Sequence, residues 1–298
     1  MWLTVAIIGY LLLSSVSILD KFILSNRSMK PIVFVFYSSI FLLPLALLLP
    51  FGVNWLNGGD WWTAIISGMV FCLAMWAFYI AFAKSEVSHV GPLVGAAVPI
   101  FTLILNQFFL KEIFTGAQLY AMIFLIVGCL LISFEKSRAH NGWHSGFLWG
   151  ILAGLLFAIS HVTAKLIYID YGFYTGFVWT RLFIAIPGVL LLFWPMVRKS
   201  LFVKKIKTKE KFSSNVVLVS INKILAVVGV LLVQYAIASG SVSVVNALGG
   251  IQFGMVVILV AFLSYFFPKL FKEEYCVGEI VQEILAVALI GFGLYLLV

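Results

Sequence analysis

The chain has 298 residues, of which 63% are hydrophobic and only 10% are charged, and its mean hydropathy is +1.15. Soluble domains carry about 25% charged residues, so this composition excludes a soluble globular protein and predicts one that lies in a lipid bilayer. The net charge of +8 does not indicate nucleic-acid binding, because the basic residues lie in short segments between apolar runs, where anionic lipid is the expected partner.

Ten apolar runs follow one another along the chain, each close to the roughly 20 residues that a membrane-spanning helix needs. They do not alternate apolar and polar residues as the strands of a membrane barrel do. The sequence therefore predicts an all-α integral membrane protein with ten transmembrane helices. The runs cover residues 2–20, 31–51, 61–83, 87–110, 116–134, 145–168, 172–196, 214–237, 242–265 and 279–298.

The joining segments leave no room for a second, aqueous domain. The longest, from Arg198 to Ser214, is rich in lysine and is expected to be a solvated loop at the lipid surface. The first run has neither a basic region before it nor a small-residue cleavage site after it, so we expect it to remain as a span and not to be removed as a signal peptide.

The second half of the chain repeats the plan of the first. The run that begins at Phe34 aligns with the run that begins at Phe177, with their prolines in register, and the polar turn near residue 86 aligns with the turn near residue 241. The sequence therefore predicts two repeats, residues 1–140 and 141–298, with five spans each. Because five is an odd number, the second repeat enters the membrane from the opposite side, as in many secondary transporters.

This arrangement resembles the EamA-type, ten-span members of the drug/metabolite transporter superfamily. The resemblance lies in the doubled five-span plan, in the proline-bearing fourth span, and in an acidic residue about four positions before a glycine: Glu112 before Gly116, and Glu274 before Gly278. The chain departs from the family at Lys111, where a glycine is usual. The resemblance implies a transporter with no enzymatic activity and a binding site between the two halves.

Orientation gives two conflicting expectations. Fifteen of the 19 lysines and arginines lie after odd-numbered runs, and the positive-inside rule then places both termini outside the cytoplasm. The family resemblance implies cytoplasmic termini instead.

Two basic residues lie within predicted spans, and they are the first candidates for substrate binding. Arg181 lies in the seventh run and Lys223 near the middle of the eighth. A charge at the centre of a spanning helix costs about 2.5 to 3.5 kcal/mol on insertion scales, which favours a functional reason for both. They suit an anionic group, although pairing with Glu283 in the tenth run is the structural alternative.

Other polar residues share faces with these cations. His161 and Lys165 are four residues apart and lie on one face of the sixth span, and Gln234 lies about three turns beyond Lys223 on the same face. We expect all three to contact substrate, with helix packing as the alternative for His161. Asp20, Asp60 and Asp170 lie at the ends of runs and are interpreted as helix caps or boundary residues.

Aromatic residues complete the predicted pocket. Trp76 and Tyr79 lie on one face of the third span, and Tyr174 precedes Arg181 by seven residues. Contact with lipid or with the protein core is the alternative for all three. Prolines of the fourth span and glycines of the ninth indicate either a gating hinge or close helix packing; these residues are Pro92, Pro99, Gly249, Gly250 and Gly254.

No catalytic, cofactor or metal motif stands out. Cys72, Cys129 and Cys276 are widely spaced, and the pair His140 and His144 in a short loop is a weak metal signal. We therefore predict no enzyme, no cofactor and no metal.

The sequence predicts a multi-pass protein, which we place in a prokaryotic inner membrane. We expect it to move a small metabolite with an anionic or zwitterionic group by alternating access. The alternatives are an exporter of amino acids or amphiphilic compounds and a non-transporting scaffold. The expected partners are the substrate and membrane lipid; a homodimer is left open, as are the substrate's identity, the direction of transport and any ion coupling.

Overall fold

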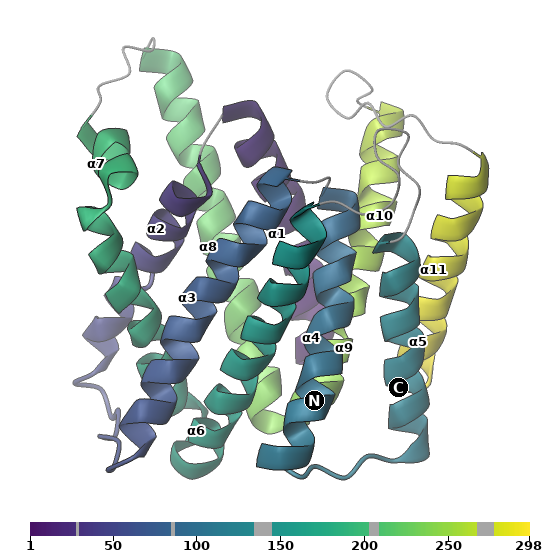
Figure 1. Cartoon of the computed structure of the whole chain (residues 1–298), viewed down its shortest axis with the longest axis horizontal. Helices are drawn as coiled ribbons and strands as arrows, with labels where there is room; N and C mark the ends of the chain where they lie inside the picture. Colours follow the sequence, from purple (N-terminus) through teal and green to yellow (C-terminus); the bar gives the residue numbers. More distant parts are fainter. Residues whose placement is uncertain (28–29, 85–86, 134–144, 203–208, 267–276) are drawn as a thin grey trace.

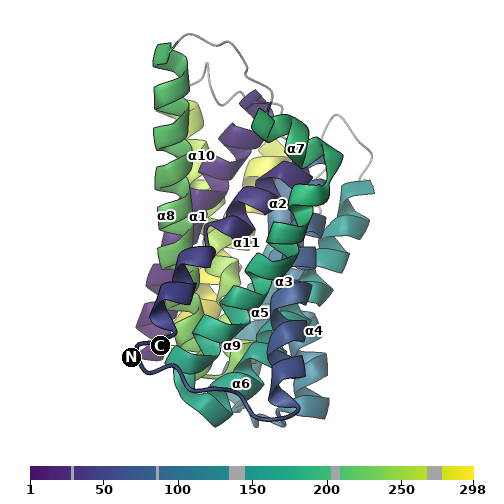
Figure 2. The ribbon, with the colours of Figure 1, turned by 90° about the vertical axis from the view of Figure 1, so that its left-hand side faces the viewer.

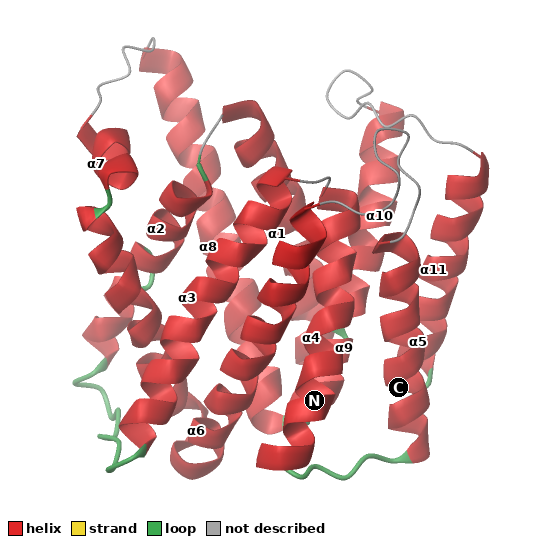
Figure 3. Cartoon of the chain, viewed as in Figure 1, coloured by secondary structure: helices red, strands yellow, loops and turns green. Residues whose placement is uncertain are grey.

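The computed structural model describes residues 1–27, 30–84, 87–133, 145–202, 209–266 and 277–298. These ranges form helices joined by short loops, with no strand among them (Figure 3). The helices in chain order are α1 (Trp2–Arg27), α2 (Pro31–Ile40), η1 (Leu43–Leu48), α3 (Asp60–Lys84), α4 (Val87–Phe109), α5 (Gly116–Ser133), α6 (Ser145–Leu190), η2 (Leu191–Phe193), α7 (Pro195–Phe202), α8 (Lys209–Ser239), α9 (Val242–Ala247), α10 (Gly249–Phe266) and α11 (Val277–Tyr295).

Eight helical stretches among the described residues are long and apolar enough to cross a bilayer, and Ile280–Tyr295 is apolar but shorter. This confirms the predicted all-α, multi-pass membrane protein. One of the eight stretches, Gly146–Phe193, has 48 residues, more than twice the length that a single crossing requires. The count of ten spans stays a prediction.

The long helix α6 reverses direction at Gly172, whose φ of 74° and ψ of 169° are not helical. Phe157 and Arg181 lie on opposite sides of this glycine and would be about 36 Å apart in a straight helix. The ring centre of Phe71 nevertheless lies 5.2 Å from that of Phe157 and 4.5 Å from the Arg181 Cζ. The two arms of α6 therefore run back alongside each other, and the bend lies at the lower end of Figure 1.

In the bundle α1 packs along α8, α3 along α6, and α5 along α11, while α4 packs against α5 and α6 and also contacts α9 and α10 (Figures 1 and 2). Small side chains permit the close approaches. A Cβ added to Gly9 would lie 3.2 Å from the Gly229 carbonyl oxygen on α8. Between α3 and α6, the Ser67 and Ser160 hydroxyls each donate to the other's carbonyl oxygen, at 2.9 and 2.8 Å.

Two predicted spans are interrupted. The run at 31–51 divides into α2 and η1, and the run at 242–265 divides into α9 and α10 at Leu248. In contrast, α4 continues through both of its prolines. The Phe253 ring of α10 lies so close to Gly91 and Gly95 on α4 that an added Cβ would be 2.8 and 2.4 Å from it. This contact favours close packing over a hinge where α4 meets α10.

The segment from Arg198 to Ser214, predicted as a loop, is partly helical. Helix α7 runs to Phe202, and α8 already begins at Lys209. The prediction was wrong for these parts because it relied on hydropathy alone, and lysine-rich sequences are compatible with helix where they extend an apolar span. Glu274, Cys276, His140 and His144 lie outside the described residues.

Both termini lie at one end of the bundle (Figures 1 and 2), whereas α3 ends and α7 lies at the other end. Lys84, Arg198 and Lys199 belong to these two helices. The positive-inside rule therefore predicts that the termini face away from the cytoplasm.

We expect alkaline phosphatase fused after Val298 to be active in cells and a fluorescent protein fused there to be dark. If the fluorescent-protein fusion is bright and the phosphatase fusion is inactive, the termini are cytoplasmic and the prediction is wrong.

Packing at Gly68 gives a test of the α3–α6 pairing. A Cβ at this position would lie 2.5 Å from the Phe183 Cβ and 2.8 Å from the Thr180 carbonyl oxygen. We expect Gly68→Ala to lower stability by about 1 to 3 kcal/mol, seen as a lower thermal midpoint by circular dichroism in detergent. Gly116→Ala is the control, because nothing lies within 4 Å of its added Cβ. Equal midpoints for the two variants would contradict the close approach of α3 to α6.

Candidate functional site

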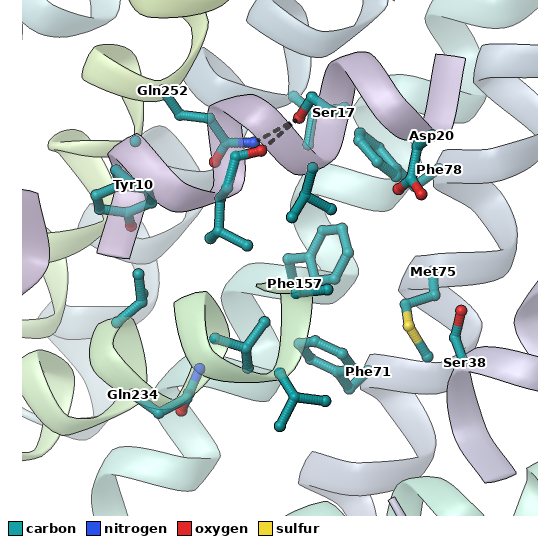
Figure 4. Close-up of a pocket in the computed structure, with 18 of the residues that line it drawn as sticks. Tyr10, Ser17, Asp20, Ser38, Phe71, Met75, Phe78, Phe157, Gln234 and Gln252 are labelled. Carbon is teal, nitrogen blue, oxygen red and sulfur yellow. Dashed lines mark hydrogen bonds between the residues drawn. The ribbon is translucent and has the colours of Figure 1, made fainter. Parts of the chain in front are cut away.

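A cavity of about 260 Å³ lies among α1, α2, α3, α4, α6, α8, α9 and α10. Its walls are mostly apolar, with a few polar side chains between the rings and aliphatic groups (Figure 4). This composition is typical of a small-molecule site, in which apolar walls bind the body of the ligand and a few polar groups orient it. Six phenylalanines contribute to the walls: Phe41, Phe71, Phe78, Phe157, Phe177 and Phe253.

The guanidinium of Arg181 is the most unusual group in the cavity. The residue is 1% exposed, and none of its three side-chain nitrogens has a hydrogen-bond partner. Its Cζ lies 4.5 Å from the ring centre of Phe71 and 5.9 Å from that of Phe177. Ring faces attract the positive charge but do not accept the five N–H groups of arginine in ordinary hydrogen bonds. The site therefore holds a buried cation that makes no hydrogen bond of ordinary geometry, although the Tyr168 hydroxyl lies close enough to interact with it.

A neutral hydrogen-bond chain lies beside this cation. His161 Nδ1 lies 2.8 Å from the Asn246 side-chain oxygen, and Asn246 donates to the Thr102 hydroxyl at 2.8 Å. Because the amide oxygen can only accept, Nδ1 carries the proton. The second ring nitrogen of His161 is then an acceptor when the ring is neutral. We call Arg181, His161 and Phe177 the arginine end of the cavity.

Gln234 also lines the cavity, at the arginine end's α8 wall. Its side-chain oxygen accepts a hydrogen bond of 2.8 Å from the Tyr168 hydroxyl. Tyr168 in turn lies near enough to Arg181 for an electrostatic interaction. Gln234 therefore faces the cavity while its oxygen is held by the first arm of α6.

A second charged group lies at the opposite pole. Lys223 is 5% exposed, donates a hydrogen bond of 2.8 Å to the Ser38 hydroxyl, and lies 3.7 Å from the ring centre of Phe34. Asp20 is also buried, accepts a hydrogen bond of 2.6 Å from Asn222, and attracts Lys223 electrostatically. We call Lys223, Asp20, Ser38 and Tyr79 the lysine end of the cavity.

Asp20 corrects two expectations. It is not a boundary residue, because α1 continues for two further turns to Arg27 and places Asp20 in the cavity wall. It is also the acidic residue beside Lys223, the role assigned to Glu283, which lies on α11 and does not line this cavity. Hydropathy indicates where the apolar run ends but not where the helix ends, so it did not place Asp20 within a helix. Asp20 and Lys223 are also too far apart in the chain for residue spacing to predict that they are neighbours.

The two ends are separated along the bundle. Phe71 and Tyr79 are eight residues apart on α3, which corresponds to about 12 Å. Phe71 contacts Arg181, and Tyr79 packs at 4.7 Å against Phe34, the ring beneath Lys223. Figure 4 shows Phe71 and Phe157 between Gln234 on one side and Asp20 and Ser38 on the other. The cavity therefore has two polar poles joined by an aromatic middle.

Lys165, predicted to guide substrate, lies outside the cavity lining. Its ammonium donates hydrogen bonds of 2.9, 3.0 and 2.8 Å to the carbonyl oxygens of Ile237, Ala238 and Gly240. These carbonyls belong to the C-terminal end of α8 and the turn after it, where a cation is favoured. The sequence correctly places Lys165 near the end of a span, but in the structure its ammonium binds backbone carbonyl oxygens.

Glu112 holds the other side of the same turn. Its carboxylate accepts a hydrogen bond of 2.6 Å from the Ser241 hydroxyl and one of 3.3 Å from the Val242 N–H. A carboxylate at a helix N-terminus satisfies N–H groups that have no partner within the helix. Glu112 and Lys165 together fix the junction between α8 and α9, and this junction positions Asn246 beside His161.

Two predicted aromatic contacts also lie elsewhere. Tyr174 is 41% exposed, and its hydroxyl donates to the Leu48 carbonyl oxygen at 3.4 Å. Trp76 packs against Phe34, Tyr79 and the neighbouring apolar clusters outside the cavity lining. Of the eight predicted substrate-binding residues, the cavity brings together His161, Arg181, Lys223, Gln234 and Tyr79.

Sequence reasoning also missed three neutral polar groups of the wall. Gln252 donates a hydrogen bond of 2.9 Å to Ser17 (Figure 4), and Tyr10 donates one of 2.9 Å to the Val245 carbonyl oxygen. Isolated polar residues in apolar runs give little signal, because most of them pack between helices. Among the described residues, no group of three or more histidine, cysteine or acidic side chains is placed to hold a metal ion.

An apolar helical bundle that surrounds a bipolar cavity is typical of a membrane transporter. The family model of the EamA-like transporter family matches residues 1–134. This match, over just under half of the chain, supports the resemblance of its first part to the drug/metabolite transporter superfamily, whose EamA-like members are transporters. The match ends near the predicted repeat boundary at residue 140.

Solved structures extend the likeness in fold to nearly the whole chain. One crystal structure, described only as that of a protein, has a TM-score of 0.67 at 14% identity and covers 99% of this chain and 94% of that chain. At this identity the similarity concerns the fold alone. No curated protein matches the chain.

The contacts of Lys165 give a testable prediction. We expect Lys165→Met to lower stability by about 2 to 4 kcal/mol, because three carbonyl oxygens, one buried and two partly buried, lose a charged donor, and to leave ligand affinity of the folded protein within about twofold. Thermal unfolding and calorimetric binding in detergent measure the two effects. Lys199→Met, on the exposed face of α7, is the control. If Lys165→Met has the thermal midpoint of the parent protein but no longer binds ligand, Lys165 contacts the substrate and the structural role is wrong.

Proposed function

We propose that this protein is a secondary transporter that moves a small organic anion with an apolar or aromatic body. The observation that carries the proposal is the buried Arg181 guanidinium, whose nitrogens lack hydrogen-bond partners within an aromatic cavity. A buried charge without partners costs several kcal/mol. A carboxylate, sulfonate or phosphate group on a ligand would supply the missing acceptors, and the fork of the guanidinium suits two oxygens at once.

The aromatic middle of the cavity fits the body of such a ligand. Phe71 and Phe157 lie between the two ends (Figure 4), Phe253 also lines the cavity, and burial of apolar surface contributes about 25 cal/mol per Å². The volume of about 260 Å³ suits a small metabolite rather than a peptide or polymer. Substrate recognition would therefore combine one strong polar anchor with non-directional apolar contact.

The helix pairings support transport by alternating access between two inverted halves. In the proposed ten-span plan, α1 and α3 are the first and third spans of one half, and the first arm of α6 and α8 are their counterparts in the other. If each helix is replaced by its counterpart, the pair α1–α8 becomes the pair α6–α3, and both pairs are present. The fourth span, α4, contacts its own counterpart, α9 and α10, and the fifth span, α5, contacts its own counterpart, α11. Such a pattern is expected of inverted repeats around a central site.

The aromatic rings beside the two cations also come from corresponding positions of the two halves. The alignment of the two halves places Phe34 opposite Phe177, and the structure places Phe34 beneath Lys223 and Phe177 near Arg181. Each half thus supplies an aromatic ring to a cation of the cavity. This supports a single site between the halves, to which both contribute.

A zwitterionic substrate is the second candidate, as for an exporter of amino acids. Asp20 favours it, because its carboxylate could meet an amine at the lysine end while Arg181 meets the acid. The separation of about 12 Å between the ends exceeds that between the amine and carboxylate of an α-amino acid, so the zwitterion would need a longer body.

Transport of a permanently charged probe tests the proposal. We expect proteoliposomes that contain the protein to exchange labelled biphenylsulfonate, an anion that does not cross lipid readily. Arg181→Gln should reduce affinity by about a hundredfold, because truncation of a buried charged partner costs about 2 to 5 kcal/mol, and Arg181→Lys should fall between the two.

Arg198→Gln is the matched control, because Arg198 is exposed on α7. Its exchange rate should equal that of the parent protein. Exchange by Arg181→Gln at the parent rate, or a parent protein that binds neutral biphenyl derivatives as well as the sulfonate, would contradict an anion site at Arg181.

A further inference from the structure

Asp20 at the lysine end has no role in the anion anchor, yet it is buried within the cavity wall at 6% exposure. Its carboxylate accepts a hydrogen bond of 2.6 Å from Asn222, the residue before Lys223, and it attracts the Lys223 ammonium electrostatically. An ionised side chain within a membrane-spanning helix is costly and calls for a functional reason. The structure also gives it a neighbour, Lys223, whose charge it offsets.

The charges that line the cavity can be counted. The described lining residues include two basic side chains, Arg181 and Lys223, and one acidic side chain, Asp20, which are counted here in their ordinary charged forms. His161 is counted as neutral, because its ring and the Arg181 guanidinium both lie beside Phe71, where a second positive charge would be repelled. The empty cavity therefore carries one net positive charge, and that charge is located at the arginine end because Asp20 offsets Lys223.

We propose that Asp20 determines the valence of the substrate: by neutralising Lys223 it leaves the cavity with a single positive charge, so that monoanions bind in preference to dianions. This inference rests on the proposed function. A bound monoanion brings the cavity to zero net charge, which favours its occlusion away from water. A dianion would place its second charge at the lysine end, beside a carboxylate.

The size of the effect follows from the separation of the two ends. Two unit charges about 12 Å apart, in surroundings with an effective dielectric constant of about 20, change each other's binding about tenfold. Loss of the Asp20 charge should therefore raise the affinity for any anion at Arg181. It should raise the affinity for a dianion further, because the second anionic group lies nearer to Asp20 than the first.

Two matched probes test this inference: biphenylsulfonate, with one charge, and biphenyldisulfonate, with charges at opposite ends of a body long enough to extend between the poles. Calorimetric binding to the purified full chain gives the ratio of the two affinities. In the parent protein the ratio should favour the monoanion. In Asp20→Asn it should shift toward the dianion by at least about tenfold.

A double variant separates charge from structural damage. Lys223→Gln leaves no net charge, and its affinity for the monoanion should fall about tenfold. Asp20→Asn combined with Lys223→Gln restores one positive charge, and the parent affinity and the preference for the monoanion should return. This comparison decides the question even where Asp20→Asn alone does not fold, because the double variant leaves no unpaired charge at the lysine end. Asp170→Asn, exposed and outside the cavity, should behave as the parent.

Three results would overturn the inference. The ratio of affinities could change by less than twofold in Asp20→Asn, or the double variant could bind the monoanion as weakly as Lys223→Gln. Alternatively, Asp20→Asn could lose the binding of an amino-substituted biphenylsulfonate alone, with the ratio unchanged, which would make Asp20 an amine site. The proposed function fails separately, if Arg181→Gln retains the parent affinity for the monoanion.

Discussion

A buried guanidinium whose nitrogens make no hydrogen bond of ordinary geometry is the feature on which the proposed function of this molecule depends. Transfer of a charge from water into an apolar interior is so unfavourable that such groups are normally paired, hydrogen-bonded or neutralised. Arg181 meets two aromatic rings, a nearby tyrosine hydroxyl and the open volume of the cavity. The fold keeps this group in place through the α6 hairpin, whose second arm carries Arg181 and whose first arm carries His161.

Polar contacts at the junction between α8 and α9 help to keep the cavity in shape. Lys165 and Glu112 bind the junction of α8 and α9 from two sides, through backbone carbonyl oxygens and through an N-terminal N–H. The junction places Asn246, which orients His161. The acidic residue Glu112, one of those that carry the family resemblance, thus has a structural role here, and it acts on the turn between α8 and α9.

Hydropathy was sufficient to predict the helical fold, because a bilayer admits few alternatives to apolar helices. Arg181 and Lys223 could be found as well, since charges within apolar runs are rare. Lys165 shows the limit of this reasoning: a cation near a span end has the same sequence signal whether it meets substrate or backbone carbonyls. Asp20 shows another limit, because its partner is provided by a helix more than 200 positions away, and only the folded chain shows that α1 continues beyond it.

The most direct measurement is a structure of the protein with biphenylsulfonate bound. We expect the sulfonate oxygens to lie within hydrogen-bond distance of the Arg181 nitrogens, with the rings between Phe71 and Phe157 and the unsubstituted end toward Lys223. A ligand seated outside this cavity, or an Arg181 that pairs with protein groups while the ligand binds elsewhere, would contradict the proposed anion site.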